Sequence, residues 1–324
     1  MPLLLTGASG FLGRNIIGRL GQCYSVTTLG RSATCDIVAD LAAGVPTLTG
    51  QFDVVVHAAG KAHELPGKEN DDDFRRVNVG GTANLCRALE ETGLPKAFVF
   101  ISSVAVYGEE AGANVTEDHP LDGTSAYARS KIEAEAIITD WCARHGVPLA
   151  ILRPALIVGP HATGNMEAMI RGIRCGFYVN VAGGKALRSI VAAADMAEVI
   201  LKAIGRNDIY NICEQRQRTV AEIARRIADL TGRRHLPSLP LWLARAAALP
   251  GDLLNALPNR NANALPSHQT NTHPTRHANA HLRRWPLDSY RLRKLTESLT
   301  FDSTKARRDL QWHPLDALAT LSIQ

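Results

Sequence analysis

Long apolar segments are missing from this 324-residue sequence, in which no apolar run reaches the ~18 residues of a membrane span. The first apolar strand, at residues 3–5, has no basic and apolar leader segment before it. Cysteine occurs as six well-separated residues without a C-x-x-C pair, a usage typical of reduced thiols in cytosolic proteins. We therefore expect a cytoplasmic protein with no membrane partner.

Signatures of several functional classes are missing as well. The sequence has no zinc-finger spacing, aromatic-basic repeat or long basic block, so we expect no nucleic-acid partner. Residues 7–10 do not match the G-x-S-x-G of hydrolases, and Gly183-Gly184-Lys185 precedes alanine where an ATP-binding loop needs Ser or Thr. The modest net charge of +5 suits an anionic small-molecule substrate.

Histidine, proline and asparagine crowd together in residues 236–284. Histidine-rich segments raise metal binding as an alternative. Because this segment approaches low complexity, we interpret residues 258–282 as a flexible loop and expect no metal site.

The chain opens with a short apolar strand and a glycine-rich turn, Gly7-Ala8-Ser9-Gly10-Phe11-Leu12-Gly13. Gly7 suits a tight turn, Gly10 the close approach of a pyrophosphate, and Gly13 the close packing of a helix on a strand. Backbone amides near Phe11 and Leu12 would then face the phosphates from a helix N-terminus. The turn therefore predicts a dinucleotide site.

The second strand, at residues 25–29, ends in Gly30-Arg31-Ser32. An acidic residue here binds the ribose 2′-hydroxyl of NAD, whereas an arginine accommodates the 2′-phosphate of NADP. We therefore favour NADP(H) over NAD(H), with Arg31 and Ser32 at the phosphate; the alternative is a solvated loop arginine. A third strand, at residues 36–39, ends in Asp40 and Leu41, which we expect at the adenine edge.

The fourth strand, at residues 53–57, is a continuous apolar run that suits a parallel sheet buried on both faces. It ends in small residues that let a ligand lie against the backbone, and we interpret His57 as a core histidine. A helix is expected over residues 75–90, within which Asn78 should bond locally and hold the catalytic strand or a relay water. The small residues are Ala58, Ala59 and Gly60.

A candidate proton-transfer site lies between residues 98 and 131. The apolar run at residues 98–101 delivers Ser103 to the end of a buried strand, and a following helix carries Tyr127 and Lys131 one turn apart. A free phenol has a pKa near ~10, and a neighbouring lysine cation should lower it. Ser103 is expected to hydrogen-bond the same substrate oxygen as Tyr127.

Strands alternate with helices as far as a strand at residues 149–153. This pattern predicts an α/β fold: a doubly wound parallel (Rossmann) sheet, with a smaller, mostly helical C-terminal substrate domain. We assign residues 1–158 and about 189–212 to the NAD(P)-binding domain. Residues of about 159–188 and 213–324 are assigned to the substrate-binding domain.

Together these motifs resemble the extended short-chain dehydrogenases/reductases of the NAD-dependent epimerase/dehydratase type, which mostly act on nucleotide sugars. The resemblance covers residues 1 to about 232 and resumes near residue 299. It rests on residues 6–13, 56–60, 78–82, 102–108, 127–131 and 152–154.

The resemblance implies a role for each matching residue. Ser103 would polarise the substrate oxygen, Tyr127 would be the acid/base, and Lys131 would bind the cofactor ribose and depress the tyrosine pKa. Pro154 would line the nicotinamide. Arg188 would contact the nucleotide diphosphate, with a helix-cap or surface arginine as the alternative, and Lys61 would do so more weakly. A homodimer formed through the helices around Asn84 and Lys131 is also implied.

Some residues depart from the family pattern, and these departures disfavour some of the reactions that family members catalyse. Sugar dehydratases carry an Asp-Glu pair where this chain has Val104 and Ala105, which disfavours dehydration. Arg31 favours exchangeable NADPH over a captive NAD, and Leu156 replaces an asparagine that often contacts the diphosphate.

The subfamily resembled is that of bacterial reductases of UDP-4-keto-6-deoxy-N-acetylhexosamines in surface-polysaccharide pathways. We expect an NADP(H)-dependent oxidoreductase that reduces the 4-keto group of a nucleotide-diphosphate sugar. An NAD-dependent nucleotide-sugar 4-epimerase and a non-catalytic dinucleotide sensor are the alternatives.

Overall fold

A seven-stranded parallel sheet forms the larger part of the protein, in a computed structural model that describes residues 1–62, 71–256 and 288–323. The strand order β12-β7-β5-β4-β1-β2-β3 changes direction between β1 and β4. In such sheets a ligand crevice opens at that switch point, outside the carboxyl ends of the strands. The predicted doubly wound fold is confirmed. The strands are β1 (Pro2–Thr6), β2 (Ser25–Gly30), β3 (Ile37–Val38), β4 (Val54–His57), β5 (Ala97–Ile101), β7 (Leu149–Pro154) and β12 (Asp208–Ile212).

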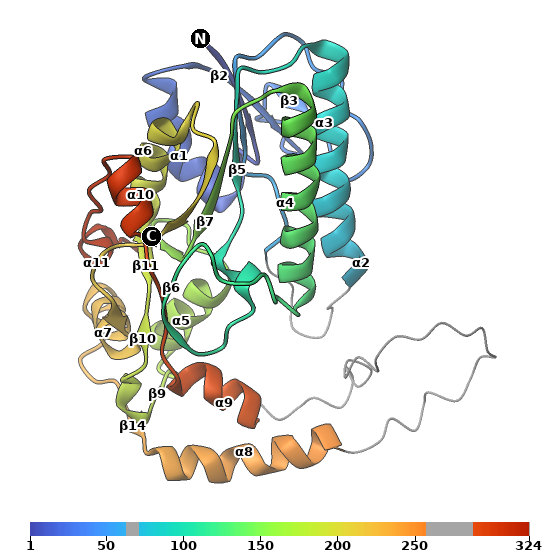
Figure 1. Ribbon diagram of the computed structural model, residues 1–324. Helices are drawn as coiled ribbons and strands as arrows, with labels where there is room; N and C mark the ends of the chain where they lie inside the picture. Colours follow the sequence, from blue (N-terminus) through green and yellow to red (C-terminus); the bar gives the residue numbers. More distant parts are fainter. Residues whose placement is uncertain (63–70, 257–287, 324) are drawn as a thin grey trace, which may run out of the picture.

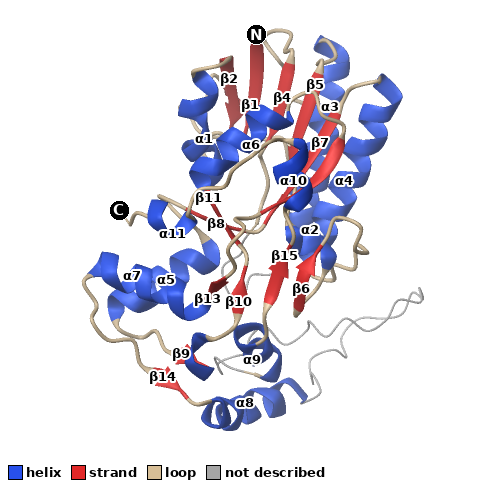
Figure 2. Ribbon diagram, turned by 60° about the vertical axis from the view of Figure 1, so that its left-hand side comes forward, coloured by secondary structure: helices blue, strands red, loops and turns tan. Residues whose placement is uncertain are grey.

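Helices cover both faces of this sheet (Figures 1 and 2). Helices α1 (Phe11–Gly21) and α6 (Ala193–Ala203) pack on one face, and α3 (Gly81–Thr92) and α4 (Ala126–His145) on the other. Successive strand side chains point to opposite faces. Leu3 and Leu5 accordingly join the core under α1 and α6, whereas Leu4 joins the core under α3 and α4. Because both faces are covered, the central strands β1, β4 and β5 are largely apolar runs.

One predicted helix is interrupted. Where the sequence predicts a continuous helix over residues 75–90, α2 (Asp71–Phe74) leads into a π-helical turn, Arg75–Gly80, before α3 begins. π-turns inside helices are rare and often lie at functional sites. This one contains Asn78, whose side chain bonds outside its own helix, and such contacts are not visible in helical periodicity.

The smaller part is built from segments that are distant in the sequence. A four-stranded sheet has the order β13 (Arg218–Thr219), β10 (Leu187–Arg188), β15 (Leu299–Phe301) and β6 (Gly112–Val115). Two strand pairs flank it: β8 (Leu156–Val158) with β11 (Ile190–Ala192), and β9 (Asn180–Val181) with β14 (Ser238–Leu239). Its helices are α5 (Gly164–Cys175), α7 (Val220–Thr231), α8 (Leu241–Ala256), α9 (Ser289–Thr296) and α11 (Ala317–Thr320), with short 3-10 turns at Val104–Tyr107 and Ala182–Gly184. Helix α10 (Thr304–Asp309) packs on β12 of the large sheet.

The smaller part contains one helix that the sequence did not predict, and the chain leaves this part again after β15. Helix α8 occupies a proline-rich stretch for which no helix was expected, and the predicted loop at residues 258–282 lies outside the described residues. Leu310 and Trp312 belong to the core beneath α1 and α6, so the chain after β15 returns to the large sheet. The domain boundaries given above stay a prediction.

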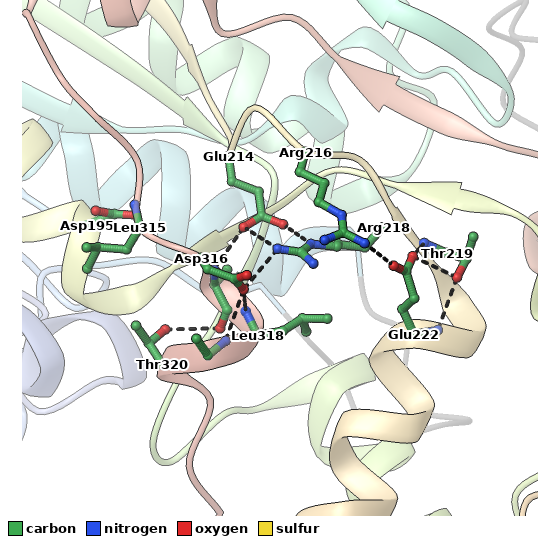
Figure 3. A network of polar contacts seen from close by, with 12 residues as sticks. Asp195, Glu214, Arg216, Arg218, Thr219, Glu222, Leu315, Asp316, Leu318 and Thr320 are labelled. Carbon is green, nitrogen blue, oxygen red and sulfur yellow. Dashed lines mark hydrogen bonds and ion pairs between the residues drawn. The ribbon is translucent and has the colours of Figure 1, made fainter.

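A buried polar network ties the end of the chain to the segment after β12 (Figure 3). The Glu214 carboxylate accepts hydrogen bonds from Arg218 Nε at 2.5 Å and from the Ala317 amide at 2.8 Å. Arg218 also pairs with Asp316 at 2.9 Å, and Asp316 caps α11. Buried charges are tolerated when they are paired and hydrogen-bonded, so this cluster is structural.

A second buried ion pair fixes α4 to β7. Arg153 Nη2 lies 2.6 Å from Glu135 Oε2, and its Nε lies 3.1 Å from Oε1, with both side chains at most 6% exposed. Arg153 also donates to the Tyr107 hydroxyl at 3.0 Å, and that hydroxyl donates to Asn211 at 2.6 Å. Removal of either charged group would leave the other charge buried without an opposite charge beside it.

Arg153→Met should therefore lower the free energy of unfolding by about 3–5 kcal/mol, since it strands the Glu135 carboxylate. The matched control is Arg75→Met, which breaks an exposed ion pair at 2.9 Å between Arg75 of the π-helical turn and Glu133 of α4. Exposed pairs contribute about 0–1 kcal/mol. Urea unfolding of both variants measures the difference, and equal losses would contradict the assigned role of the buried pair.

Candidate active site

The glycine turn lies at the switch point and has no room for larger residues. Gly7 has a positive φ of 72°, and an added Cβ would lie 2.7 Å from the Ala59 nitrogen. A Cβ at Gly13 would lie 2.3 Å from the Gly7 oxygen. No side chain caps α1 at Gly10, which leaves the first amides of that helix available to an anion. The turn thus fits a dinucleotide pyrophosphate.

A chain of buried hydrogen bonds fixes the ends of β1 and β4 beside this turn. His57 Nδ1 lies 2.6 Å from Thr6 Oγ1, and its Nε2 lies 3.0 Å from Thr82 Oγ1. Thr82 already donates its only hydroxyl proton to the Asn78 carbonyl, so His57 must donate from Nε2 and accept from Thr6. Burial, and then the Lys131 charge, lower the pKa of His57 to about 3. His57 is the neutral core histidine that the sequence indicated.

Asn78 joins the loop after β4 to α4. Its Oδ1 accepts from the Lys61 amide at 2.7 Å, and its Nδ2 donates to the Lys61 carbonyl at 3.0 Å and to Ser130 Oγ at 2.8 Å. Ser130 in turn donates to the Tyr127 carbonyl at 2.7 Å. Asn78 therefore holds backbone around the predicted cofactor loop of Ala58, Ala59 and Gly60, and a Cβ at Gly60 would lie 3.0 Å from Asn78 Oδ1.

Ser103 and Tyr127 come together as the sequence predicts. Ser103 follows β5 and caps the 3-10 turn by accepting from the Ala105 amide at 3.2 Å. Tyr127 lies in the first turn of α4, partly buried, with its ring 6.2 Å from that of Phe74. Burial raises the pKa of Tyr127, although a hydrogen bond with Ser103 opposes that rise. The expectation of a lowered phenol pKa is wrong for this structure, because desolvation outweighs the other effects.

Lys131 points toward the end of β5. Its Nζ donates to the Ile101 carbonyl at 2.6 Å and lies 4.3 Å from the centre of the Phe100 ring. Burial lowers the pKa of Lys131 to about 8, and the nearby Glu135 carboxylate partly opposes the shift. The ammonium is thus fixed by a backbone acceptor, which explains why it does not govern the Tyr127 phenol here.

Ser102 is a residue that the sequence analysis did not assign to the site. Its side chain is buried, and its Oγ has no hydrogen-bond partner among the described residues. It precedes Ser103 at the carboxyl end of β5, while Pro154 ends the neighbouring strand β7. A buried hydroxyl without a partner costs free energy, so it is suited to a ligand group at this edge. The Ser-Ser pair after an apolar strand is the sequence signal for it.

The loop after β2 offers a free cation at the outer part of the crevice. Arg31 is exposed and forms no hydrogen bond or ion pair within the described ranges. Ser32 Oγ lies 2.8 Å from Thr34 Oγ1. Asp40 caps the next turn through the Ala42 amide at 3.0 Å, and the buried Leu41 accepts from Asn84 at 2.8 Å through its carbonyl. The roles of Arg31, Ser32, Asp40 and Leu41 toward a cofactor stay predictions.

The two predicted diphosphate contacts have partners within the protein. Lys61 Nζ forms an ion pair with Asp73 at 3.3 Å and lies 4.9 Å from the centre of the Phe74 ring. Arg188 donates to the Leu187 and Glu297 carbonyls, each at 2.7 Å, and to the Lys294 carbonyl. Arg188 thus caps the end of α9, as the helix-cap alternative described. A substrate contact by either residue stays a proposal.

The described part of the chain also has a hollow that lies away from these residues. An open hollow of about 630 Å³ lies beside the Glu214–Arg218 network, and none of the predicted site residues lines it. Within the described part of the chain, no cluster of three or more His, Cys, Asp or Glu could hold a metal ion. The chemistry-bearing groups therefore converge at the carboxyl edge of the large sheet.

A glycine turn and a loop of small residues at the switch point of a parallel sheet define the class of dinucleotide-binding α/β proteins. The model of the NAD dependent epimerase/dehydratase family matches residues 3–213, and the chain belongs to that family. Proteins of this family are NAD(P)-dependent enzymes, and this chain is one of them.

Several relatives are similar over most of their length. The N-acetyl-alpha-D-glucosaminyl-diphospho-ditrans,octacis-undecaprenol 4-epimerase of Escherichia coli O157:H7 is 29% identical over 259 residues, which cover 72% of this chain and 75% of the relative. The GDP-6-deoxy-D-mannose reductase of Pseudomonas aeruginosa is 25% identical over 248 residues, covering 70% and 79%. The structure of RMD from Pseudomonas aeruginosa complexed with NADPH aligns with a TM-score of 0.69 and 18% identity, covering 98% and 95%.

The lowered pKa of Lys131 gives a test of its burial. Because this pKa is lower in the folded than in the unfolded chain, the unfolded chain binds more protons between about pH 8 and pH 10.5. The Lys131 contribution to the free energy of unfolding should therefore rise by roughly 3 kcal/mol across that window. Urea unfolding of the cofactor-free protein and of Lys131→Met at pH 7.5 and pH 10 measures it. A difference between the two proteins that does not change with pH would show that Lys131 is not buried as described.

Proposed function

We propose that the protein is an NADP(H)-dependent reductase of the 4-keto group of a nucleotide-linked sugar. The observation that carries this proposal is Arg31, a free cation at the end of β2 where NAD-binding proteins place an acid. The Pseudomonas aeruginosa reductase and the NADPH complex of RMD support it by analogy. A cytoplasmic location and a homodimer through α3 and α4 belong to the same proposal.

In the proposed reduction, each of these residues has a separate role. NADPH, when bound, supplies the hydride. Tyr127 donates the proton to the carbonyl oxygen, and Ser103 donates a hydrogen bond to the same atom. Burial raises the pKa of Tyr127, so its phenol holds the proton at neutral pH and is a weaker acid than a free phenol. Lys131 would bind the cofactor ribose, and Ser102 would hydrogen-bond a ligand group from the end of β5.

The pyrophosphate would lie on the first amides of α1, where Gly7, Gly10 and Gly13 leave the backbone open. Phe11 and Leu12 contribute their backbone amides there. Ala58 and Ala59 line the crevice from the end of β4, and Pro154 lines the nicotinamide side. Asn78 supports this cradle through the Lys61 backbone.

A second candidate function is NAD-dependent 4-epimerisation, which the name of the Escherichia coli relative favours. The same Ser103, Tyr127 and Lys131 would serve it. Protein that purifies with bound NAD and interconverts sugars without added coenzyme would replace the reductase proposal. That relative also makes a sugar on a diphospho-polyprenol a second candidate substrate class, alongside a sugar on a nucleotide.

Tyr127→Phe removes the proton donor but keeps the ring against Phe74. Turnover of NADPH with a UDP-4-keto sugar should fall by about 10²–10⁴-fold, the usual contribution of a general acid. NADPH binding, followed by fluorescence titration, should stay within about twofold. Normal turnover in this variant would remove Tyr127 from the mechanism, whereas a wild-type chain that binds NADPH without any turnover would favour the sensor alternative.

Arg31→Asp should reverse the cofactor preference, because a carboxylate repels a 2′-phosphate and accepts from a ribose 2′-hydroxyl. We expect about 10–100-fold weaker NADPH binding, the equivalent of losing one charge-assisted hydrogen bond. The matched control is Arg206→Asp, an exposed arginine in the turn before β12, at the opposite edge of the sheet. Isothermal titration with NADPH and NADH measures both variants; an unchanged ratio of the two affinities would refute the role of Arg31.

A further inference from the structure

Helix α8 has apolar side chains on two sides. Its inner side packs on α9 through Ala244 and Ala248, which are fully buried. On its outer side Trp242, Leu249 and Leu253 are 69%, 65% and 68% exposed. These three positions lie on one face at 3.6 residues per turn. We call them the α8 face. A surface helix normally presents polar groups on that side, so the α8 face has the composition of a contact surface.

The α8 face lies at one extremity of the protein. Figures 1 and 2 both show α8 at the end of the molecule farthest from the N-terminus of the chain. Strand β14 leads directly into α8 and pairs with β9, and the nearby Phe177 is 84% exposed. An apolar surface at the tip of a molecule is accessible to a large flat partner.

Helices α8 and α9 carry more basic than acidic side chains, with four cations and one acid. Two of the cations have an acid just outside these helices: Arg291 lies 3.8 Å from Asp288, and Arg293 lies 3.4 Å from Glu110. That acid, Asp252, is held by the Ser289 amide at 2.9 Å and the Ser289 hydroxyl at 2.6 Å. Arg245 is exposed on α8 beside the apolar positions, and Tyr290 is 48% exposed on α9. The cations are Arg245, Arg291, Arg293 and Lys294.

We propose that the α8 face docks on the surface of an anionic lipid bilayer. Apolar residues with tryptophan, flanked by arginine and lysine, are the features of helices that lie in the plane of a membrane interface. Arginine side chains can extend to the lipid phosphates while their stems cover apolar surface, and basic groups near anionic lipids add to the attraction. A second copy of this chain fits less well, because the contact would bring like charges together.

The expectation of no membrane partner rested on the absence of a spanning segment. No helix in the described ranges is long and apolar enough to cross a membrane, and α8 has 16 residues. That finding does not bear on a helix that lies along the interface. The proposal is also independent of the reductase activity, since neither Tyr127 nor Lys131 belongs to α8.

The test uses the full chain and vesicles of phosphatidylcholine with or without phosphatidylglycerol. Co-sedimentation should show binding that requires the anionic lipid and falls as salt rises from 50 to 500 mM. A variant with Trp242→Ser, Leu249→Ser and Leu253→Ser should lose at least tenfold in partitioning. The matched control carries Leu94→Ser, Leu230→Ser and Leu315→Ser, which replace exposed leucines elsewhere and should leave binding unchanged.

Two further measurements settle the outcome. Brominated lipids should quench the tryptophan fluorescence of the wild-type chain and quench that of Trp242→Phe much less. Turnover of a soluble substrate should be the same in the wild-type chain and in the α8 variant, which separates failure of this proposal from failure of the proposed function. The proposal is overturned if wild type and α8 variant bind vesicles equally. It is also overturned if sedimentation velocity shows that the α8 substitutions dissociate a dimer instead.

Discussion

The position of α4 against the carboxyl ends of β5 and β7 determines the geometry of the whole site. Two buried cations set that position. Lys131 bonds from α4 to the Ile101 carbonyl at the end of β5, and Arg153 bonds from β7 to Glu135, one turn further along α4. Each contact crosses from a helix to a strand, so together they prevent both sliding and rotation of α4. Tyr127, one turn before Lys131, is therefore placed by groups that do not themselves react.

The other wall of the crevice is fixed by neutral hydrogen bonds. The bonds run from Thr6 through His57 and Thr82 to Asn78, and so connect the ends of β1 and β4 with α3. Burial keeps His57 neutral, and each hydrogen bond in the chain has one assigned donor and one assigned acceptor. Such fully satisfied networks favour one arrangement over its alternatives. In the proposed function, the charge of a bound dinucleotide would be balanced by the first amides of α1 and by Arg31 and not by this neutral network.

Some of this architecture could be predicted because it depends on short stretches of sequence. The apolar runs of β4 and β5, the glycines of the first turn and the Tyr127–Lys131 spacing each carry their own signal. The π-helical turn at Asn78 could not be found, since it arises from bonds to Lys61 and Ser130, far along the chain. The direction of the Tyr127 pKa shift was missed because burial, not sequence spacing, determines it.

The structure of the smaller part of the protein is harder to predict from sequence for a related reason. Its four-stranded sheet joins β6, β10, β13 and β15, which come from four distant segments of two to four residues each. Arg188 shows the consequence: its guanidinium bonds to carbonyls at the end of α9, more than a hundred residues away. A residue in such a sheet is constrained by neighbours that no local pattern specifies. Because the proposed catalytic groups lie on long, locally encoded elements and the proposed substrate contacts do not, the sequence indicates the proposed chemistry more clearly than the proposed substrate.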